Sequence, residues 1–397
     1  MKKFLLFALV GLLPLTFLAC KNQGEVLYVL NWGEYINEDL VAQFTEDTGI
    51  VVEISTVDSN EKMKEALELG TSTYDIVVPS DYMIEYLYDN DYLQQIDLSK
   101  LTHFAEANFM DGVDSIMDQL FVDNEDVTSP YQVAIPYFWG LFGLMYNDTV
   151  PGLQEYIEAN GWGAIFGPDE SGISGLRSGI YSVPRFVYSA ALLYAASEDT
   201  LYPAVADNAM NVYSAANVEL VESILGERSY TEFGTDAMKK NIDSDTLDIA
   251  FTYVGDFFDT YLGNCETVGA TTGEAAEAAN AHLGIYIPSR TIAFVDCMVI
   301  PKDAENVDNA HIFIDYFLDP ANAYVNSGIV GYTTTLKATY NMILNATEGD
   351  LVRQAMVQNH PYDPMTVAGV AGIPLIIFRD DETSNIDTMF TRVINAN

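Results

Sequence analysis

The sequence predicts an α/β fold in which strands and helices alternate around a parallel sheet. Apolar, β-branched runs at residues 50–56 and 74–78 read as strands, and each is followed by a stretch with apolar residues at helical spacing. Strands that alternate with helices of this length favour a parallel sheet. The 397 residues are also enough for two domains of ordinary size.

Capping residues mark where the first helices begin and end. Asn and Ser side chains accept hydrogen bonds from free amides of a first helical turn, and Gly tolerates the left-handed conformation that ends a helix. The predicted start and stop residues are Asn37 and Gly49 for the first helix, Ser59 or Asn60 and Gly70 for the second, and about Ser80 for the start of the third.

A second set of elements follows from residue 135 onward. Strands are favoured by β-branched and aromatic runs, and helices by apolar residues three and four apart. The predicted elements are strands at 138–146, 247–253 and 294–300, helices at 186–196, 207–225 and 306–318, and a surface loop or short helix at 265–280.

The N-terminus has the pattern of a bacterial export signal. Lys2 and Lys3 precede an apolar run at residues 4–19, which is too short for a permanent membrane helix. The segment Phe17-Leu18-Ala19-Cys20 resembles a lipobox, in which the Cys becomes the first mature residue and is diacylated. We therefore expect a lipoprotein signal peptide at residues 1–20 and a lipid anchor at Cys20, with a plain cleaved secretory signal as the alternative.

The charge balance is strongly acidic, with 58 Asp and Glu against 17 Lys and Arg and a net charge of −41. Nucleic acids and anionic lipid surfaces are excluded as partners, because phosphate binding needs clustered basic residues. Cations would be attracted. Solubility or a saline habitat would explain the same excess.

Two cysteines remain beyond Cys20, namely Cys265 and Cys297. An even pair in an exported protein allows a disulfide, but a single pair of thiols does not establish one. The pairing stays open from sequence.

Motifs that carry aromatic and acidic residues lie where predicted strands end. Ligands of α/β proteins bind at the carboxyl ends of strands. The motifs are Asn31-Trp32-Gly33-Glu34-Tyr35, Val78-Pro79-Ser80-Asp81-Tyr82, Ile135-Pro136-Tyr137-Phe138-Trp139-Gly140, Phe294-Val295-Asp296 and Gly331-Tyr332-Thr333. In this order, over residues 26–336, they resemble the periplasmic spermidine/putrescine-binding proteins of polyamine ABC transporters.

The resemblance implies an α/β, two-lobed periplasmic-binding-protein (type II) fold with a ligand cleft between the lobes. Lobe 1 would combine residues 25–135 with 296–340, and lobe 2 residues 136–295 with 341–397. The protein would capture a polyamine outside the cytoplasm and deliver it to the permease of an ABC importer. It would be a monomer without enzymatic activity, cofactor or bound metal.

An alkylamine site needs carboxylates for the charged ends and aromatic faces along the stem. By resemblance, Asp296 is the central amine-binding carboxylate and Phe294 and Tyr253 flank the ligand. The remaining ligand-binding residues implied are Trp32, Glu34, Tyr35, Ser80, Tyr82 and Tyr332. Two of these residues have an alternative role that does not involve a ligand: Ser80 could cap the third helix, and Glu34 could point to solvent.

Some positions depart from the family pattern. Two acidic residues that polyamine binders carry on the segment 182–186 appear here as Val183 and Phe186, and Gly33 replaces a hydroxyl residue. Asp256, Asp259 or Glu34 could hold the second end of a linear polyamine. A shorter diamine, or another amine with a larger apolar part, stays open as the ligand. Arg185 or Arg379 in the cleft would instead favour an amino acid or a betaine-like zwitterion.

Three other functions compete with a binding protein. An exported hydrolase would need a nucleophile elbow, but Gly172-Ile173-Ser174-Gly175-Leu176 lacks its final Gly. The histidines His103, His282, His311 and His360 show no metal-ligand spacing. A metal-binding lipoprotein could use Asp123-Asn124-Glu125-Asp126 or Asp243-Ser244-Asp245, although neither completes a calcium loop. A purely structural surface lipoprotein is the third.

Overall fold

The computed structural model describes residues 26–397 except 71–72, 123, 199, 347–349 and 364–366. Its first part is a parallel sheet in the order β2-β1-β3 with a helix after each strand. Leu27, Val29 and Leu30 of the central strand are buried, which is why this strand lies in the middle. The bounds are β1 (Val26–Trp32), α1 (Glu38–Thr48), β2 (Val51–Val57), α2 (Asn60–Leu69), β3 (Ile76–Val77) and α3 (Asp81–Asp89).

The predicted helix caps of α1 and α2 are confirmed. The Asn37 side chain accepts hydrogen bonds from the amides of Asp39 and Leu40, and Gly49 ends α1 at φ 78°. Ser59 caps α2 in the same way, so Asn60 is the first helical residue. Ser80 stands at the N-cap position of α3 but makes no capping hydrogen bond with its side chain.

The second part of the fold is a larger, mixed sheet. Among the described residues its order is β13-β10-β5-β8-β6-β7, and β9 and β12 also pair with β5. Strand β6 is parallel to β7 and β8, whereas β5 is antiparallel to β8 and β10, so the parallel prediction holds for only part of the sheet. The bounds are β5 (Ile135–Asn147), β6 (Ser178–Tyr181), β7 (Glu232–Gly234), β8 (Ile249–Tyr253), β9 (Leu283–Tyr286), β10 (Arg290–Met298), β12 (Thr333–Thr334) and β13 (Ala371–Pro374). A separate pair is formed by β4 (Leu93–Gln94) and β11 (Ile300–Pro301).

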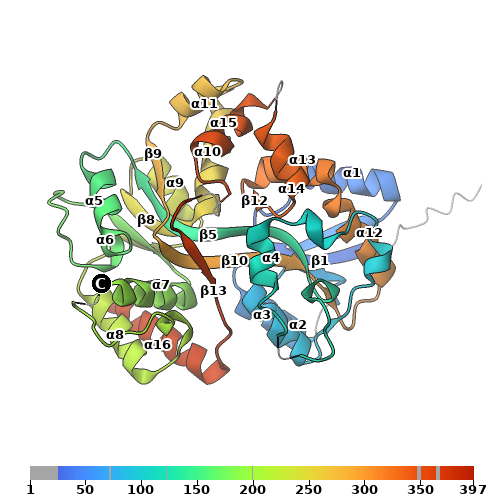
Figure 1. Cartoon of the computed structure of the whole chain (residues 1–397), viewed down its shortest axis with the longest axis horizontal. Coiled ribbons are helices and arrows are strands. Elements are labelled where there is room, and N and C mark those ends of the chain that lie inside the picture. Colours follow the sequence, from blue (N-terminus) through green and yellow to red (C-terminus); the bar gives the residue numbers. More distant parts are fainter. Residues whose placement is uncertain (1–25, 71–72, 123, 199, 347–349, 364–366) are drawn as a thin grey trace, which may run out of the picture.

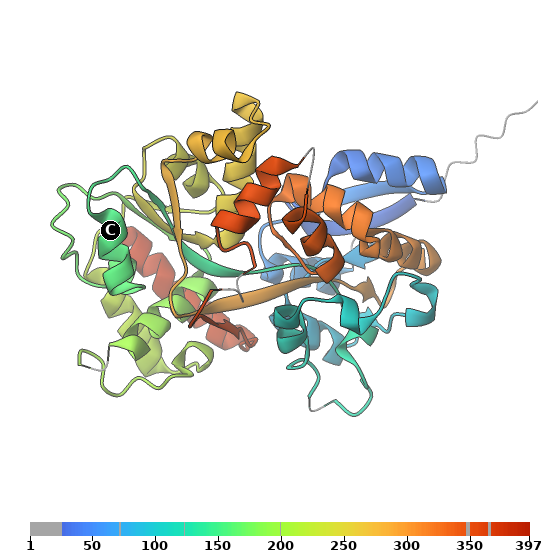
Figure 2. The ribbon, with the colours of Figure 1, turned by 45° about the horizontal axis from the view of Figure 1, so that its top comes forward.

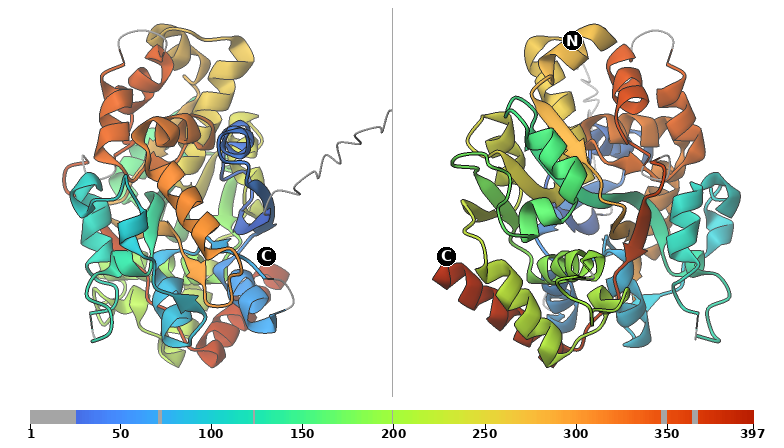
Figure 3. Two further views of the ribbon diagram at one scale, coloured as in Figure 1. Left: turned by 90° about the vertical axis from the view of Figure 1, so that its right-hand side faces the viewer. Right: turned by 60° about the vertical axis from the view of Figure 1, so that its left-hand side comes forward.

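Helices surround this sheet, and the C-terminal helix α16 lies against α7 and α8 (Figure 3). Figure 2 shows α15 beside α10 and α11. No helix in the described ranges is long and apolar enough to cross a membrane. The bounds are α4 (Asp111–Met117), α5 (Leu153–Asn160), α6 (Gly163–Phe166), α7 (Pro184–Ser197), α8 (Ala215–Gly226), α9 (Ala237–Asp243), α10 (Val254–Val268), α11 (Gly273–Ala279), α12 (Val307–Leu318), α13 (Pro320–Val330), α14 (Lys337–Leu344), α15 (Leu351–Asn359) and α16 (Asp380–Ala396).

One helix prediction is wrong in its first half. Residues 207–225 contain a short 3₁₀ turn at Ala209–Asn211, and α8 begins only at Ala215. The side chain of Ser214, whose backbone is extended, accepts a hydrogen bond from the Asn217 amide and so starts a new helix there.

The strands β5 and β10 join the two parts of the molecule and run side by side across its middle (Figure 1). The end of β10 also reaches the segment after β3, because the Cys297 amide donates to the Pro79 carbonyl at 2.9 Å. The register between β10 and β5 shifts between Asp296 and Cys297. Such an irregularity re-aims a side chain, and here it lies at the junction of the two sheets.

The two cysteines are free thiols, so the disulfide that the sequence allowed is not formed. Cys265 lies in α10, where its sulfur accepts a hydrogen bond from the Asn280 amide at 3.4 Å. Cys297 lies in β10 beside the Met117 sulfur at 3.9 Å. Both are buried, each in its own part of the core.

Candidate ligand-binding site

A cavity of about 400 Å³ lies where the two sheets meet. Its walls come from the segments that follow β1, β2 and β3, from the ends of β6 and β8, and from α9, α10, β10 and the loop after α13. Of the predicted site residues, those that line it are Trp32, Glu34, Tyr35, Ser80, Tyr253, Phe294, Asp296 and Tyr332. Segments that are far apart in the sequence, from Trp32 to Tyr332, therefore line one cavity.

The Asp296 carboxylate is the polar centre of this cavity. It is only 6% exposed and accepts hydrogen bonds from the Tyr35 hydroxyl at 2.7 Å and the Ser80 hydroxyl at 2.6 Å. Burial raises its pKa to about 6, although the bonds from Ser80 and Tyr35 lower it. The carboxylate is thus largely ionised at neutral pH, and its remaining lone pairs can accept hydrogen bonds from a ligand.

Ser80 belongs to a hydrogen-bonded pair behind Asp296. The Asn60 side-chain amide donates to the Ser80 hydroxyl at 3.0 Å, and the Ser80 backbone amide donates to the Asn60 oxygen at 3.0 Å. Because the Ser80 hydroxyl donates to Asp296, it does not cap α3. Capping of α3 by the Ser80 side chain is therefore not observed, and a contact of Ser80 with the ligand stays a prediction.

Aromatic rings form much of the cavity wall. Tyr35 meets Tyr332 edge to face with ring centroids 5.0 Å apart, and Tyr253 lies 5.2 Å from Phe294. Tyr181, at the end of β6, also lines the cavity 5.2 Å from Tyr253. Such faces attract an alkylammonium group through their negative π-systems.

The Tyr332 ring packs directly against the backbone of Gly255. A Cβ atom at Gly255 would lie 2.7 Å from three atoms of the Tyr332 ring, so only glycine allows this approach. The Tyr332 hydroxyl donates a hydrogen bond to Asp256 at 3.2 Å. This ring therefore connects the loop after α13 with the start of α10.

A second acidic group lies at the α9 and α10 side of the cavity. Burial raises the pKa of Asp256 to about 7, although the nearby Lys239 lowers it. The Lys239 ammonium lies 2.6 Å from an Asp259 oxygen and 3.9 Å from a Glu34 oxygen. Glu34 itself has a positive φ of 53°, and its side chain is 70% exposed.

Several cavity residues were not foreseen from sequence. Tyr181 directly precedes the segment 182–186 that was compared with the family, and this position was its only signal. Lys239 lies on α9 and Asp236 is the N-cap residue of this helix, for which no prediction was made.

The structure places Tyr82 outside the main cavity, against expectation. It is the second residue of α3 and its hydroxyl donates to Glu61 of α2 at 3.4 Å. Tyr82 and Phe186 line a smaller cavity that shares Ser80, Tyr253 and Phe294 with the main one. Tyr82 thus lies beside the main cavity, with its hydroxyl directed toward α2.

Neither arginine considered for ligand binding lines the cavity. Arg185 is buried and donates to the carbonyls of Met210 and Ile376 at 3.1 and 3.0 Å, so it holds the C-terminal segment in place. Arg379 is exposed and pairs with Glu382 at 2.9 Å. These contacts remove the reason for expecting a carboxylate-bearing ligand.

Two positions that are acidic in polyamine binders hold apolar residues here. Val183 is the N-cap residue of α7, and Phe186 packs against Phe142 and Tyr253 with ring centroids 4.9 and 5.9 Å away. Neither residue carries a charge, and neither lines the main cavity.

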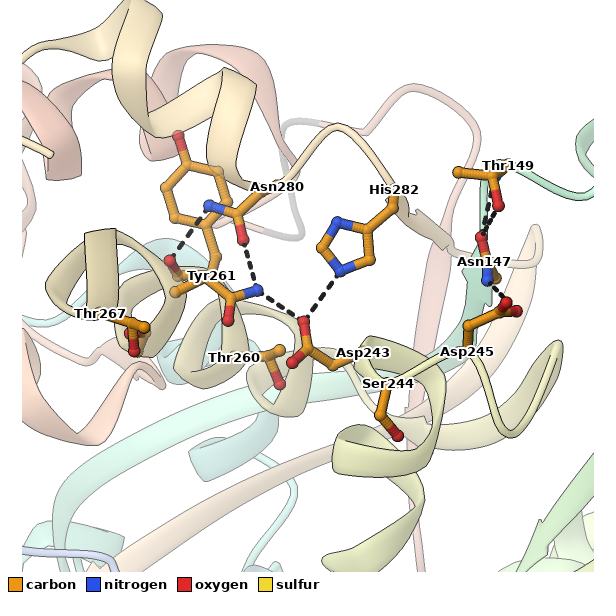
Figure 4. Close-up of polar contacts among 12 residues, drawn as sticks. Asn147, Thr149, Asp243, Ser244, Asp245, Thr260, Tyr261, Thr267, Asn280 and His282 are labelled. Atoms are coloured by element: carbon orange, nitrogen blue, oxygen red, sulfur yellow. Dashed lines mark hydrogen bonds and ion pairs between the residues drawn. The ribbon is translucent and has the colours of Figure 1, made fainter. Parts of the chain in front are cut away.

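The Asp243-Ser244-Asp245 segment has structural partners (Figure 4). Asp243 accepts hydrogen bonds from Asn264 at 2.6 Å and pairs with His282 at 2.9 Å. The Ser244 hydroxyl lies 3.3 Å from the Thr246 hydroxyl, whereas the His282 ring contacts Asp243. A Ser–His pair of the kind that activates a nucleophile is therefore not seen in this segment. In the part of the chain that the structure describes, no group of three or more His, Cys, Asp or Glu side chains could hold a metal ion.

Comparisons with known proteins identify the family. Residues 39–348 match the bacterial extracellular solute-binding proteins. The chain belongs to this family. It is a substrate-binding component of an ABC transporter with an extracytoplasmic location, and it is not an enzyme.

Alignments with similar solute-binding proteins cover most of this chain. The putrescine-binding periplasmic protein SpuD of Pseudomonas aeruginosa is 29% identical over 339 residues, which cover 82% of this chain and 83% of SpuD. The putrescine-binding periplasmic protein PotF of Escherichia coli is 27% identical and covers 81% of this chain and 80% of its own. A solved structure from Listeria monocytogenes superimposes with a TM-score of 0.71 at 25% identity over 94% of this chain and 100% of that one. The fold is the type II periplasmic-binding-protein fold.

Proposed function

We propose that this solute-binding protein captures a small organic cation, a polyamine or a related amine, and delivers it to the permease of an ABC importer. The observation that carries the proposal is the buried Asp296 carboxylate, held by Tyr35 and Ser80 and facing an aromatic cavity. Similar proteins that bind putrescine support the ligand class.

The site suits an ammonium group for electrostatic reasons. Asp296 already accepts two hydrogen bonds and can accept more from an ammonium, which has only donors to offer. Tyr253, Phe294 and Trp32 supply ring faces for the alkyl stem. The net charge of −41 adds a long-range attraction for cations.

A zwitterionic ligand is disfavoured by the same cavity. Its carboxylate would need a free cationic side chain. The two lysines that line the cavity are paired instead, Lys62 with Asp58 at 2.7 Å and Lys239 with Asp259 at 2.6 Å.

The lobes would be residues 25–135 with 296–340 and residues 136–295 with 341–397, joined through β5 and β10. Asp296, Tyr35 and Ser80 then belong to lobe 1 and Tyr253 to lobe 2. A ligand between them contacts both lobes only in the closed form, so its differential affinity favours closure.

The proposal includes a membrane tether for a monomeric protein. Cys20 lies outside the described residues, and its lipidation rests on the signal at residues 1–20. Cells that express the wild type should retain the protein in the membrane fraction, whereas Cys20→Ala should release it. A wild-type protein found only in the soluble fraction contradicts the anchor.

A thermal-shift panel tests the ligand class. It contains putrescine, cadaverine, spermidine, spermine, agmatine, n-butylamine, amino acids and betaines. A ligand at 100 times its Kd stabilises the folded state by about 2.7 kcal/mol. We expect at least one amine to raise Tm and amino acids and betaines to leave it unchanged. If no amine raises Tm, the proposed ligand class is wrong.

A further inference from the structure

Lys239 is a cation inside a cavity that would bind cations. It lies on α9, and its side chain is only 8% exposed. Burial alone would lower the pKa of its ammonium group, but Asp256 and Asp259 raise it above the usual value. Lys239 therefore carries a positive charge at neutral pH.

Lys239 lies among most of the carboxylates that could hold a second ammonium of a ligand. Asp236 also lines the cavity and helps to raise the Lys239 pKa, and Asp58 pairs with Lys62. Asp259 binds the Lys239 ammonium directly at 2.6 Å, and Glu34 lies 3.9 Å away. Asp256 is close enough to shift the Lys239 pKa and lines the same cavity. The two acidic positions of polyamine binders on the segment 182–186 hold Val183 and Phe186 here, so no carboxylate is supplied from that segment.

We propose that Lys239 determines specificity by occupying the second-cation position, so that the cavity favours an amine with one ammonium group, held at Asp296, over a diamine of equal length. This inference rests on the proposed function. A second ligand ammonium would lose the Asp259 partner and would lie near the Lys239 charge. Like charges a few ångströms apart in a partly buried site repel each other.

Lys62 provides a matched comparison. It lines the same cavity and pairs with Asp58 at 2.7 Å, but its side chain is 59% exposed. Water and salt screen such a surface charge. Removal of the Lys62 charge should therefore change ligand selectivity little.

The test uses two ligands that differ by one ammonium group, n-butylamine and putrescine. Their Kd values are measured by calorimetry at pH 7.5 for the mature wild type, Lys239→Met, Lys239→Gln and Lys62→Met. We expect the preference for putrescine over n-butylamine to rise at least about tenfold in both Lys239 variants, because a nearby repulsion is removed. Lys62→Met should keep the wild-type preference.

Three further results bear on the role of Lys239. An unchanged preference in folded Lys239 variants overturns it and leaves the proposed function intact. If neither variant folds, the wild type decides: tighter binding of n-butylamine than of putrescine supports a blocked second position, and tighter binding of putrescine overturns it. If no amine binds the wild type, the proposed function fails and this inference fails with it.

Discussion

The Tyr35 hydroxyl donates a hydrogen bond of 2.7 Å to Asp296, although 261 positions separate the two residues in the chain. Ser80 donates the second bond to the same carboxylate from 216 positions away. Three distant segments thus converge on one buried anion. Its ionisation and its hydrogen-bond donors determine how the cavity binds a cation.

Amine affinity should depend on pH through Asp296. Its pKa is raised to about 6 by burial, and the ammonium requires the ionised carboxylate. Above pH 7 binding should be strongest, and below pH 6 the Kd of putrescine should rise by about tenfold per pH unit. Titrations between pH 5 and 8 measure this dependence. A Kd that stays constant from pH 8 to pH 5 would contradict an ionised Asp296 as the amine partner.

Tyr35→Phe should weaken binding by removing one donor to Asp296. The pKa of Asp296 should rise further, because a bond that lowers it is lost. We expect the Kd at pH 7 to rise by about tenfold or more, as for the loss of one hydrogen bond to a charged group, and the pH midpoint of binding to move upward. Tyr131→Phe removes a similar Tyr–Asp bond outside the cavity, from Tyr131 to Asp114 at 2.6 Å, and should leave the Kd unchanged. Equal effects of the two variants on the Kd would show that the Tyr35 bond has no specific role.

Gly255→Ala should displace the Tyr332 ring from the cavity wall. The new methyl group would lie 2.7 Å from the ring, and overpacking of this kind costs about 1–3 kcal/mol. We expect the Kd to rise about tenfold or more. Gly263→Ala lies in the same helix, where nothing approaches within 4 Å, and should preserve binding. If Gly255→Ala binds as the wild type does, the close packing of the Tyr332 ring on Gly255 is not needed for ligand binding.

Arg185→Met should lower stability without changing ligand binding. The substitution removes the hydrogen bonds that Arg185 donates to Met210, Asn211 and Ile376, although the Met210 carbonyl keeps a bond from Ser189. Loss of these bonds should lower the free energy of unfolding by about 1–3 kcal/mol. Arg379→Met removes only an exposed pair and should cost less than about 1 kcal/mol. Chemical denaturation gives the stabilities. A large loss of amine affinity in folded Arg185→Met would instead place this residue in recognition.

Local features of the fold were predictable from the sequence. The caps at Asn37 and Gly49 depend on neighbouring backbone groups, so a few residues contain the whole signal. The strand runs depend on composition in the same way. Asp296 and its aromatic neighbours were expected through the order of motifs along the chain, not through any local physical rule.

Features that depend on distant segments were not predictable. Whether Ser80 caps a helix or binds Asp296 depends on a strand 216 positions away. The direction of Tyr82 follows from the rotation of α3 against α2. Lys239 has no sequence signal as a cavity residue, because only the packing of α9 beside α10 brings it to Asp259.

Asp296→Asn should fold well, which makes it a sound probe of the site. The folded-state pKa of Asp296 lies above the usual value of 3.8, so its contribution to stability falls as pH rises from about 4 to 6. The neutral amide avoids this cost. Above pH 6 the ligand-free variant should be more stable than the wild type by up to about 3 kcal/mol, and near pH 4 the two should agree.

The central claim is that Asp296 holds the ammonium group of the ligand. Calorimetric titration of putrescine into Asp296→Asn and Asp58→Asn at pH 7.5 tests it directly. Asp58 lines the same cavity, but its side chain is 69% exposed. We expect Asp296→Asn to raise the Kd by at least about 100-fold, because the buried charge partner of the ammonium is lost, and Asp58→Asn to stay within about threefold of the wild type. Wild-type affinity in folded Asp296→Asn would contradict the account.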